Sequence, residues 1–282
     1  MTQYLQDVTR PAFMSLICEA VGGNPAATTA MAVPMVLING AIDLHDDVID
    51  RSKTKMGRPT VLGKFGKDIA LLVGDALLFK GFELLNKVGR GMSAQKANAI
   101  MSNVKDMFFE LGDSEALELQ FRGRLDITPK EYLNVVRKRA SNVEVHARIS
   151  AIICNCSERE VEALGKFSRT LGVLFVMRDD YIDALDPVEL RHRAKYESLP
   201  LPLIYALQNP ETKKEILQVL TKTEVTRRDI DALIDTILSS GGFGEVKKKM
   251  QLLVKAGQSH LNSIKVQGRD LNLIMSSTLE GL

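Results

Sequence analysis

The feature that most constrains this chain is an acidic pattern, Asp-Asp-x-x-Asp, which occurs twice inside apolar, helix-compatible segments. The two copies consist of Asp46, Asp47 and Asp50, and of Asp179, Asp180 and Asp183. Residues three and four apart share one face of a helix, so each copy presents its carboxylates to one side. Like charges packed together are costly unless a cation neutralises them. A fold that contains both copies therefore needs cations close to them.

The neighbours of both motifs indicate buried helices. Residues 33–44 and 171–177 are almost uninterrupted apolar runs, so the carboxylates continue helices that are otherwise inside the protein. The alternative, solvated charge on an exposed helix face, does not explain two copies in the same setting. Hard cations such as Mg²⁺ take oxygen ligands, retain several waters and are often shared with substrate phosphates. Two such clusters facing each other across a cavity would hold a diphosphate between metal ions.

Helical periodicity extends over nearly the whole chain, and no pair of alternating strand patterns joined by a turn is recognisable. Helix starts are indicated by capping boxes at 128–131 and 157–160 and by Asp186 and Asn209 before prolines. The helices expected from this pattern are 11–22, 26–50, 66–88, 93–122, 129–155, 158–185, 187–197, 200–208, 211–220, 227–239, 243–266 and 269–280. Short connections between long helices predict an all-α fold, a single helical bundle that forms one domain over residues 1–282.

Composition excludes several classes of protein. The formal net charge of +2 provides no basis for a nucleic-acid partner. No apolar run approaches the length of a membrane span, and the first residues do not read as a signal peptide, which predicts a cytoplasmic protein that does not span a membrane. Cys18, Cys154 and Cys156 have no zinc-site spacing and are expected to be free thiols on helix faces.

Several further stretches carry a family resemblance. They are Arg10-Pro11 before a helix that ends in Gly22-Gly23, Gly57-Arg-Pro-Thr-Val61, Val73-Gly-Asp-Ala-Leu-Leu78 and Leu199-Pro-Leu-Pro-Leu-Ile-Tyr-Ala206. Together with the two aspartate motifs, they make the chain similar to the trans-isoprenyl diphosphate synthases, or polyprenyl synthetases, over nearly its whole length.

The resemblance implies the isoprenoid synthase fold, a helical bundle around a central cavity, in a homodimer. It also implies three Mg²⁺ ions held by the six aspartates, which are the expected catalytic and metal-binding residues. In this family an allylic isoprenyl diphosphate loses its diphosphate, the double bond of isopentenyl diphosphate attacks the allylic cation, and a proton is lost. Metal ions neutralise charge on the leaving group, and a dry cavity keeps water from the cation.

The resemblance also assigns contacts to the substrate diphosphates. The expected substrate-binding residues are Arg10, Lys55, Arg139 and Arg193. The loop that carries Arg193 is shorter than usual in the family, so Arg191 or Lys195 is an alternative at that position. Solvated helix charge is the alternative interpretation of Arg139 and Arg193.

The chain departs from the family pattern on the acceptor side. Asp7, Asn39 and Met56 stand where the family has a lysine, a histidine and an arginine. A charge-assisted hydrogen bond contributes roughly 1.5–3 kcal/mol, so the loss of several predicts poor use of isopentenyl diphosphate by the protein alone. Asp43 is also unusual, because this position is apolar in the family. It either extends a polar stripe toward the hydrocarbon pocket or turns toward a partner helix or a subunit interface.

Three hypotheses for the function follow. The first is a Mg²⁺-dependent prenyltransferase that elongates an allylic isoprenyl diphosphate with isopentenyl diphosphate. The second is an enzyme that ionises an allylic diphosphate and uses another fate, such as cyclisation, capture by water or a different acceptor. The third is a subunit of a heteromeric synthase, against which the intact aspartates speak.

Overall fold

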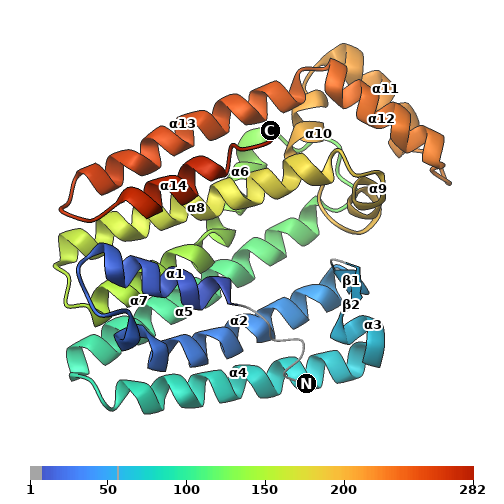
Figure 1. Ribbon diagram of the computed structural model, residues 1–282. Coiled ribbons are helices and arrows are strands. Elements are labelled where there is room, and N and C mark those ends of the chain that lie inside the picture. Colours follow the sequence, from blue (N-terminus) through green and yellow to red (C-terminus); the bar gives the residue numbers. More distant parts are fainter. Residues whose placement is uncertain (1–7, 56) are drawn as a thin grey trace. The chain divides into compact units, whose positions relative to one another are not determined.

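The computed structural model describes residues 8–55 and 57–282, and helices dominate it (Figure 1). The α-helices are α1 (Thr9–Ala20), α2 (Thr29–Ile49), α3 (Val61–Phe65), α4 (Lys67–Gly89), α5 (Ala94–Phe121), α6 (Pro129–Arg139), α7 (Ser141–Ile153), α8 (Glu158–Asp183), α9 (Pro187–Tyr196), α10 (Leu201–Ala206), α11 (Pro210–Leu220), α12 (Arg227–Ser239), α13 (Gly242–Asn262) and α14 (Arg269–Ser277). A 3-10 turn, η2 (Pro25–Thr28), precedes α2, and two short strands, β1 (Thr54–Lys55) and β2 (Arg58–Pro59), pair antiparallel. The predicted all-α class is confirmed.

The helix starts read from the sequence are present. The Thr128 side chain accepts a hydrogen bond from the backbone N–H of Glu131, whose carboxylate accepts one from the backbone of Thr128 in return. Asp186 caps α9 by accepting from the backbone N–H groups of Val188 and Glu189. These contacts satisfy N–H groups that a helix terminus would otherwise leave unpaired.

Local features that differ from the sequence prediction include the short helix α3, a divided helix and a hairpin. The helix expected over 129–155 is divided into α6 and α7 at Ala140, which is buried against α8, where a Cβ added to Gly172 would lie 2.9 Å from the Ala140 Cβ. The hairpin β1–β2 was not predicted, because strands of two residues carry no detectable alternation. Gly57, in the turn, has a φ of +71°, a conformation that glycine adopts without strain.

The chain divides into two compact units. The first contains the described residues up to Asp106, together with Val145–Leu164 and Lys265–Gly268. Within it, α2 and α4 lie side by side over much of their length (Figure 1). Leu44, Val61, Ala70 and Val73 form a buried cluster that joins α2, α3 and α4. This cluster supports the end of α2 that carries the first aspartate motif.

The second unit contains Met107–Glu144, Gly165–Ile264 and Arg269–Leu282, and it carries the second aspartate motif at the end of α8. Short α10 packs against both α6 and α13, and α11 pairs with α12 (Figure 1). The residues that α8 and α10 contribute to its core include Phe167, Leu171, Leu203 and Ile204, none of which is solvent-accessible. The prediction of a single domain over 1–282 stays a prediction.

The expectation that no apolar run approaches the length of a membrane span needs correction. Within the described residues, the segment Pro25–Ile49 is long and apolar enough to cross a membrane by length and composition. More than half of its most apolar window is buried inside the protein, as in a core helix of a globular protein. The burial of this segment therefore favours a core helix over a membrane span.

The cysteines also differ from the expectation of three free thiols. Cys18, at the end of α1, and Cys154, just after α7, form a disulfide within the first unit, with their Cα atoms 6.2 Å apart. Cys156 is the cysteine that stays free. The two partners are 136 residues apart in sequence, so only the packing of the chain brings them together.

Candidate active site

The first aspartate motif lies at the C-terminal end of α2. Asp47 is 6% exposed, whereas Asp46 and Asp50 are only half-buried. The Lys55 Nζ lies 2.7 Å from Asp47 Oδ1 and 3.6 Å from Asp46 Oδ2. Burial raises the pKa of Asp47, and its hydrogen bond to the Lys55 ammonium partly opposes that rise. The motif thus already contains one cation supplied by the chain.

The segment after α2 places Lys55 against the motif. The backbone N–H of Ser52 donates to the Asp47 carbonyl oxygen, and the Thr60 hydroxyl donates to the Ser52 carbonyl oxygen at 2.7 Å. The Thr60 side chain also caps α3. The hairpin between these contacts is therefore fastened at both ends, which holds Lys55 on the α2 side.

Arg10 forms an ion pair with Asp43. Its Nη1 and Nη2 donate to the two carboxylate oxygens of Asp43 at 3.2 and 3.3 Å. Of the alternatives for Asp43, this pairing favours the turn toward a neighbouring helix, because Arg10 belongs to α1. Arg10, a predicted substrate-binding residue, is therefore paired with Asp43, whose position is apolar in the family.

The second motif is organised around Asp180, which is 1% exposed. Its Oδ1 accepts hydrogen bonds from the Tyr132 hydroxyl at 2.9 Å and from Arg193 Nη1 at 2.6 Å. Its Oδ2 accepts from the backbone N–H of Leu201 at 3.3 Å. Tyr132 is a site residue that the sequence did not predict, since no local signal links a tyrosine of α6 to an aspartate of α8.

The other two aspartates of this motif are more accessible. Asp183 is half-buried and lies 3.0 Å from Arg193 Nη1. Asp179 lies at the surface of the unit, yet partial burial of its carboxylate and the charges of Asp183 and Asp180 raise its pKa to about 6. A cation beside Asp179 would stabilise its ionised form.

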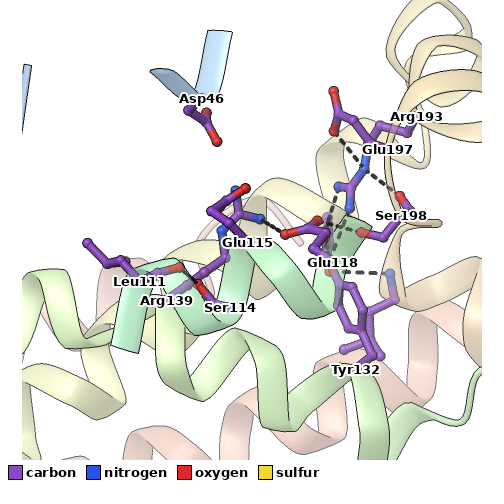
Figure 2. A network of polar contacts seen from close by, with 12 residues as sticks. Asp46, Leu111, Ser114, Glu115, Glu118, Tyr132, Arg139, Arg193, Glu197 and Ser198 are labelled. Atoms are coloured by element: carbon purple, nitrogen blue, oxygen red, sulfur yellow. Dashed lines mark hydrogen bonds and ion pairs between the residues drawn. The ribbon is translucent and has the colours of Figure 1, made fainter. Parts of the chain in front are cut away.

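Arg193 is 6% exposed and belongs to a buried polar network (Figure 2). Its Nε donates to the Ser198 carbonyl oxygen at 3.2 Å, and its Nη2 donates to the Tyr132 hydroxyl at 3.1 Å. The guanidinium is thus engaged on all three nitrogens by the protein. Arg191 and Lys195, the alternatives considered for substrate contact, are exposed.

Arg139 continues the same network in the second unit (Figure 2). Its Nη1 lies 2.9 Å from Glu118 Oε2, while the Ser198 hydroxyl donates to Glu118 Oε1 at 2.5 Å. Burial opposes ionisation of Glu118, but the charge of Arg139 and the Ser198 hydrogen bond outweigh it and lower the pKa. Arg139 keeps 28% of its side chain exposed and remains accessible to a ligand.

The three departures on the acceptor side have different outcomes. Asp7 and Met56 lie outside the described residues. Asn39 is fully buried in α2, where its Nδ2 donates to the Met35 carbonyl oxygen at 2.8 Å and lies 3.3 Å from His146 Nε2. Asn39 is therefore part of the core of the first unit.

The carboxylates fit a metal ion that is shared with a substrate. Within residues 8–55 and 57–282, no three His, Cys, Asp or Glu side chains converge as a site made of protein ligands alone would require. Mg²⁺ usually binds through one or two carboxylates and is completed by water and substrate phosphates. Accessible oxygen donors of this kind are Asp46 and Asp50 in the first motif and Asp179 and Asp183 in the second. Each of these pairs suits Mg²⁺ in the presence of a diphosphate.

Known proteins match this chain over most of its length. Residues 7–237 match the family model of polyprenyl synthetases. The chain is 30% identical over 275 residues to the geranylgeranyl diphosphate synthase of Methanosarcina mazei, covering 94% of this chain and 83% of that protein. It is 29% identical over 249 residues to the short chain isoprenyl diphosphate synthase of Methanothermobacter thermautotrophicus, covering 88% and 72%.

Solved structures show the same fold. The crystal structure of geranylgeranyl pyrophosphate synthetase from Pyrococcus horikoshii Ot3 superposes with a TM-score of 0.86 at 23% identity, covering 97% of this chain and 86% of that chain. The chain therefore belongs to the polyprenyl synthetase family and has the all-α isoprenoid synthase fold. It is a transferase of the isoprenyl diphosphate synthase type. The family depends on Mg²⁺ and uses allylic and isopentenyl diphosphates.

Proposed function

We propose that this protein is a Mg²⁺-dependent prenyltransferase that elongates an allylic isoprenyl diphosphate with isopentenyl diphosphate. The observation that carries the proposal is the pair of Asp-Asp-x-x-Asp motifs at the ends of α2 and α8, each with accessible carboxylates. Three Mg²⁺ ions, shared with the allylic diphosphate, are the number that the family resemblance implies. When bound, they neutralise the charge that develops on the departing diphosphate.

The chain's own residues have separate roles in this proposal. Asp46, Asp50, Asp179 and Asp183 bind the metal ions, while Asp47 and Asp180 hold Lys55 and Arg193 in place. Lys55 and Arg139 keep 53% and 28% of their side chains exposed and contact the allylic diphosphate. Arg10 contacts the acceptor diphosphate, which binds without metal. Arginine suits this role because its fork matches a phosphate in geometry.

The state of the acceptor residues favours a second candidate function, ionisation of the allylic diphosphate with another fate. Arg10 is paired with Asp43 and Asn39 is buried, so the described acceptor residues are less available than the family pattern requires. An enzyme that ionises the allylic diphosphate and directs the cation to another acceptor or to cyclisation needs fewer of these contacts.

One experiment separates the candidates. The purified protein is incubated with Mg²⁺ and dimethylallyl, geranyl, farnesyl or geranylgeranyl diphosphate, with and without isopentenyl diphosphate. A longer prenyl diphosphate that forms only with isopentenyl diphosphate supports the first function, and release of diphosphate without it supports the second. Asp46→Asn is the matched control, since it removes one metal-binding charge and should abolish both. No consumption of any donor would contradict both functions and leave a subunit of a heteromeric synthase.

We further propose that the protein forms a homodimer through α4, with a heteromer as the alternative. Ile69, Leu72 and Phe79 are 43%, 65% and 79% exposed and share one face of this helix. Exposed apolar faces of this kind mark association surfaces. Light scattering should report a dimer for the parent protein and a monomer for Phe79→Glu, and an unchanged mass of this variant would contradict the proposal. The cytoplasmic location stays a prediction, which cell fractionation tests.

A further inference from the structure

Asp43 and Arg10 form a two-point ion pair on the first unit. The Arg10 Nη1 and Nη2 lie 3.2 and 3.3 Å from Asp43 Oδ2 and Oδ1, so both terminal nitrogens bind the same carboxylate. The two side chains are 26% and 52% exposed, which places the pair at the solvent boundary. A pair in this position holds a defined geometry but can open without a large cost.

The position of Asp43 relates this pair to the first motif. Asp43 precedes Asp46 by three residues and Asp47 by four, so the three carboxylates follow one face of α2. Lys55 pairs with two of the three carboxylates of the motif, those of Asp46 and Asp47. Arg10 pairs with Asp43, one turn before them. Lys55 and Arg10 therefore bind neighbouring carboxylates on this face of α2.

We propose that Asp43 is a specificity residue that lowers the affinity for the diphosphate of the acceptor by occupying the guanidinium fork of Arg10. This inference rests on the proposed function, because that function assigns Arg10 to the acceptor diphosphate. Carboxylate and phosphate bind the same fork of an arginine in the same two-point geometry, so they compete for it. Once displaced, the carboxylate of Asp43 also repels the diphosphate, which adds to the loss of affinity.

Competition for Arg10 and a purely structural role predict opposite changes in acceptor binding when Asp43 is replaced. If Asp43 only held Arg10 in a productive position, its removal would weaken binding of the acceptor. If Asp43 competes for Arg10, its removal strengthens binding. The sign of the change therefore separates the two roles.

The experiment measures binding of isopentenyl diphosphate by titration calorimetry, without Mg²⁺ and without an allylic donor, so that no turnover occurs. Asp43→Asn should bind about fivefold more tightly than the parent protein, the change expected for removal of one exposed ion pair. Asp43→Leu restores an apolar residue and should bind at least as tightly. Glu83→Gln removes the same charge from α4, where Glu83 pairs with Lys80 at 2.8 Å, and should leave the affinity unchanged.

A double variant tests whether the effect passes through Arg10. In Arg10→Gln, addition of Asp43→Asn should give much less than the gain seen in the parent background, since paired residues are not additive. Unchanged or weaker binding by both Asp43 variants would overturn the proposal. A parallel assay measures elongation of farnesyl diphosphate by the parent protein with isopentenyl diphosphate and Mg²⁺. It distinguishes failure of the Asp43 proposal from failure of the proposed function. If the Asp43 variants bind isopentenyl diphosphate more tightly but no elongated product forms, the proposed function is refuted. The competition between Asp43 and a diphosphate for Arg10 would still be shown.

Discussion

At the scale of single residues, the three aspartates of each motif occupy different environments. Asp47 and Asp180 are buried, and each is paired with a cation from the same unit, Lys55 or Arg193. The accessible carboxylates are the ones that we propose as metal ligands. The middle residue of each motif therefore acts on a cation of the chain, which positions that cation next to the site.

Asp180→Asn is expected to destabilise the fold by about 3 kcal/mol, because removal of one partner leaves a buried Arg193 with less compensating charge. Asp179→Asn should keep or slightly increase stability, since the raised pKa of Asp179 shows that its charge is disfavoured in the folded protein. Urea unfolding at pH 7 measures both effects, and calorimetry measures Mg²⁺-dependent diphosphate binding. Asp179→Asn should lose this binding while it remains folded. Equal stability of the two variants would contradict the division of roles.

At the scale of elements, the close approach of α2 and α4 depends on two glycines. A Cβ added to Gly81 would lie 2.6 Å from Ile38 Cγ1, and one added to Gly74 would lie 2.7 Å from His45 Nε2. His45 Nε2 also lies 3.2 Å from Asp75 Oδ1 on α4. Because His45 directly precedes Asp46, this contact helps to set the end of α2 that carries the motif.

Gly81→Ala is expected to lower the free energy of unfolding by about 1–3 kcal/mol, the usual effect of overpacking a tight helix contact. The matched control is Gly112→Ala in α5, where an added Cβ meets no atom within 4 Å. This control should raise stability slightly, since alanine is the better helix former. Thermal unfolding of both variants provides the measurement. A Gly81→Ala protein as stable as the parent would show that α4 can move away from α2.

At the scale of the whole molecule, a disulfide closes a long stretch of chain. Cys18 and Cys154 join the end of α1 to the end of α7. Gly23 lies beside both sulfur atoms, and a Cβ there would be 2.7 Å from each Sγ. A crosslink over such a separation reduces the conformational freedom of the unfolded chain, which stabilises the folded state.

Cys18→Ser is expected to reduce stability by about 5 kcal/mol, the value that loop closure predicts for a crosslink of this length. Thermal unfolding with and without a reductant measures the effect, and the reductant should not change the variant. Cys156→Ser, which leaves the crosslink intact, serves as the control and should unfold like the parent. Alkylation of the native protein followed by mass spectrometry should modify only Cys156. Modification of all three cysteines without reductant would contradict the disulfide.

The sequence by itself determined the helical class, most helix boundaries and the family. These depend on periodicity, capping residues and motif spacing. Such features arise from residues that are close together in the sequence, so they can be recognised before the fold is known. The start of α6 at Thr128 and of α9 at Asp186 are examples. The two aspartate motifs also belong here, since the burial of the helices that carry them follows from the apolar runs, although only Asp47 and Asp180 among their carboxylates are buried.

Only the tertiary structure decided the partners of the charged and thiol groups. Nothing near Asp43 in the sequence indicates Arg10, and nothing near Arg193 indicates that Asp180 and Tyr132 would bury it. Cys18 likewise meets a thiol more than a hundred residues away. The physical reason is that ion pairs, hydrogen bonds and disulfides act over a few ångströms. Their partners are therefore set by how helices pack, and packing depends on contacts between residues that are distant in the chain.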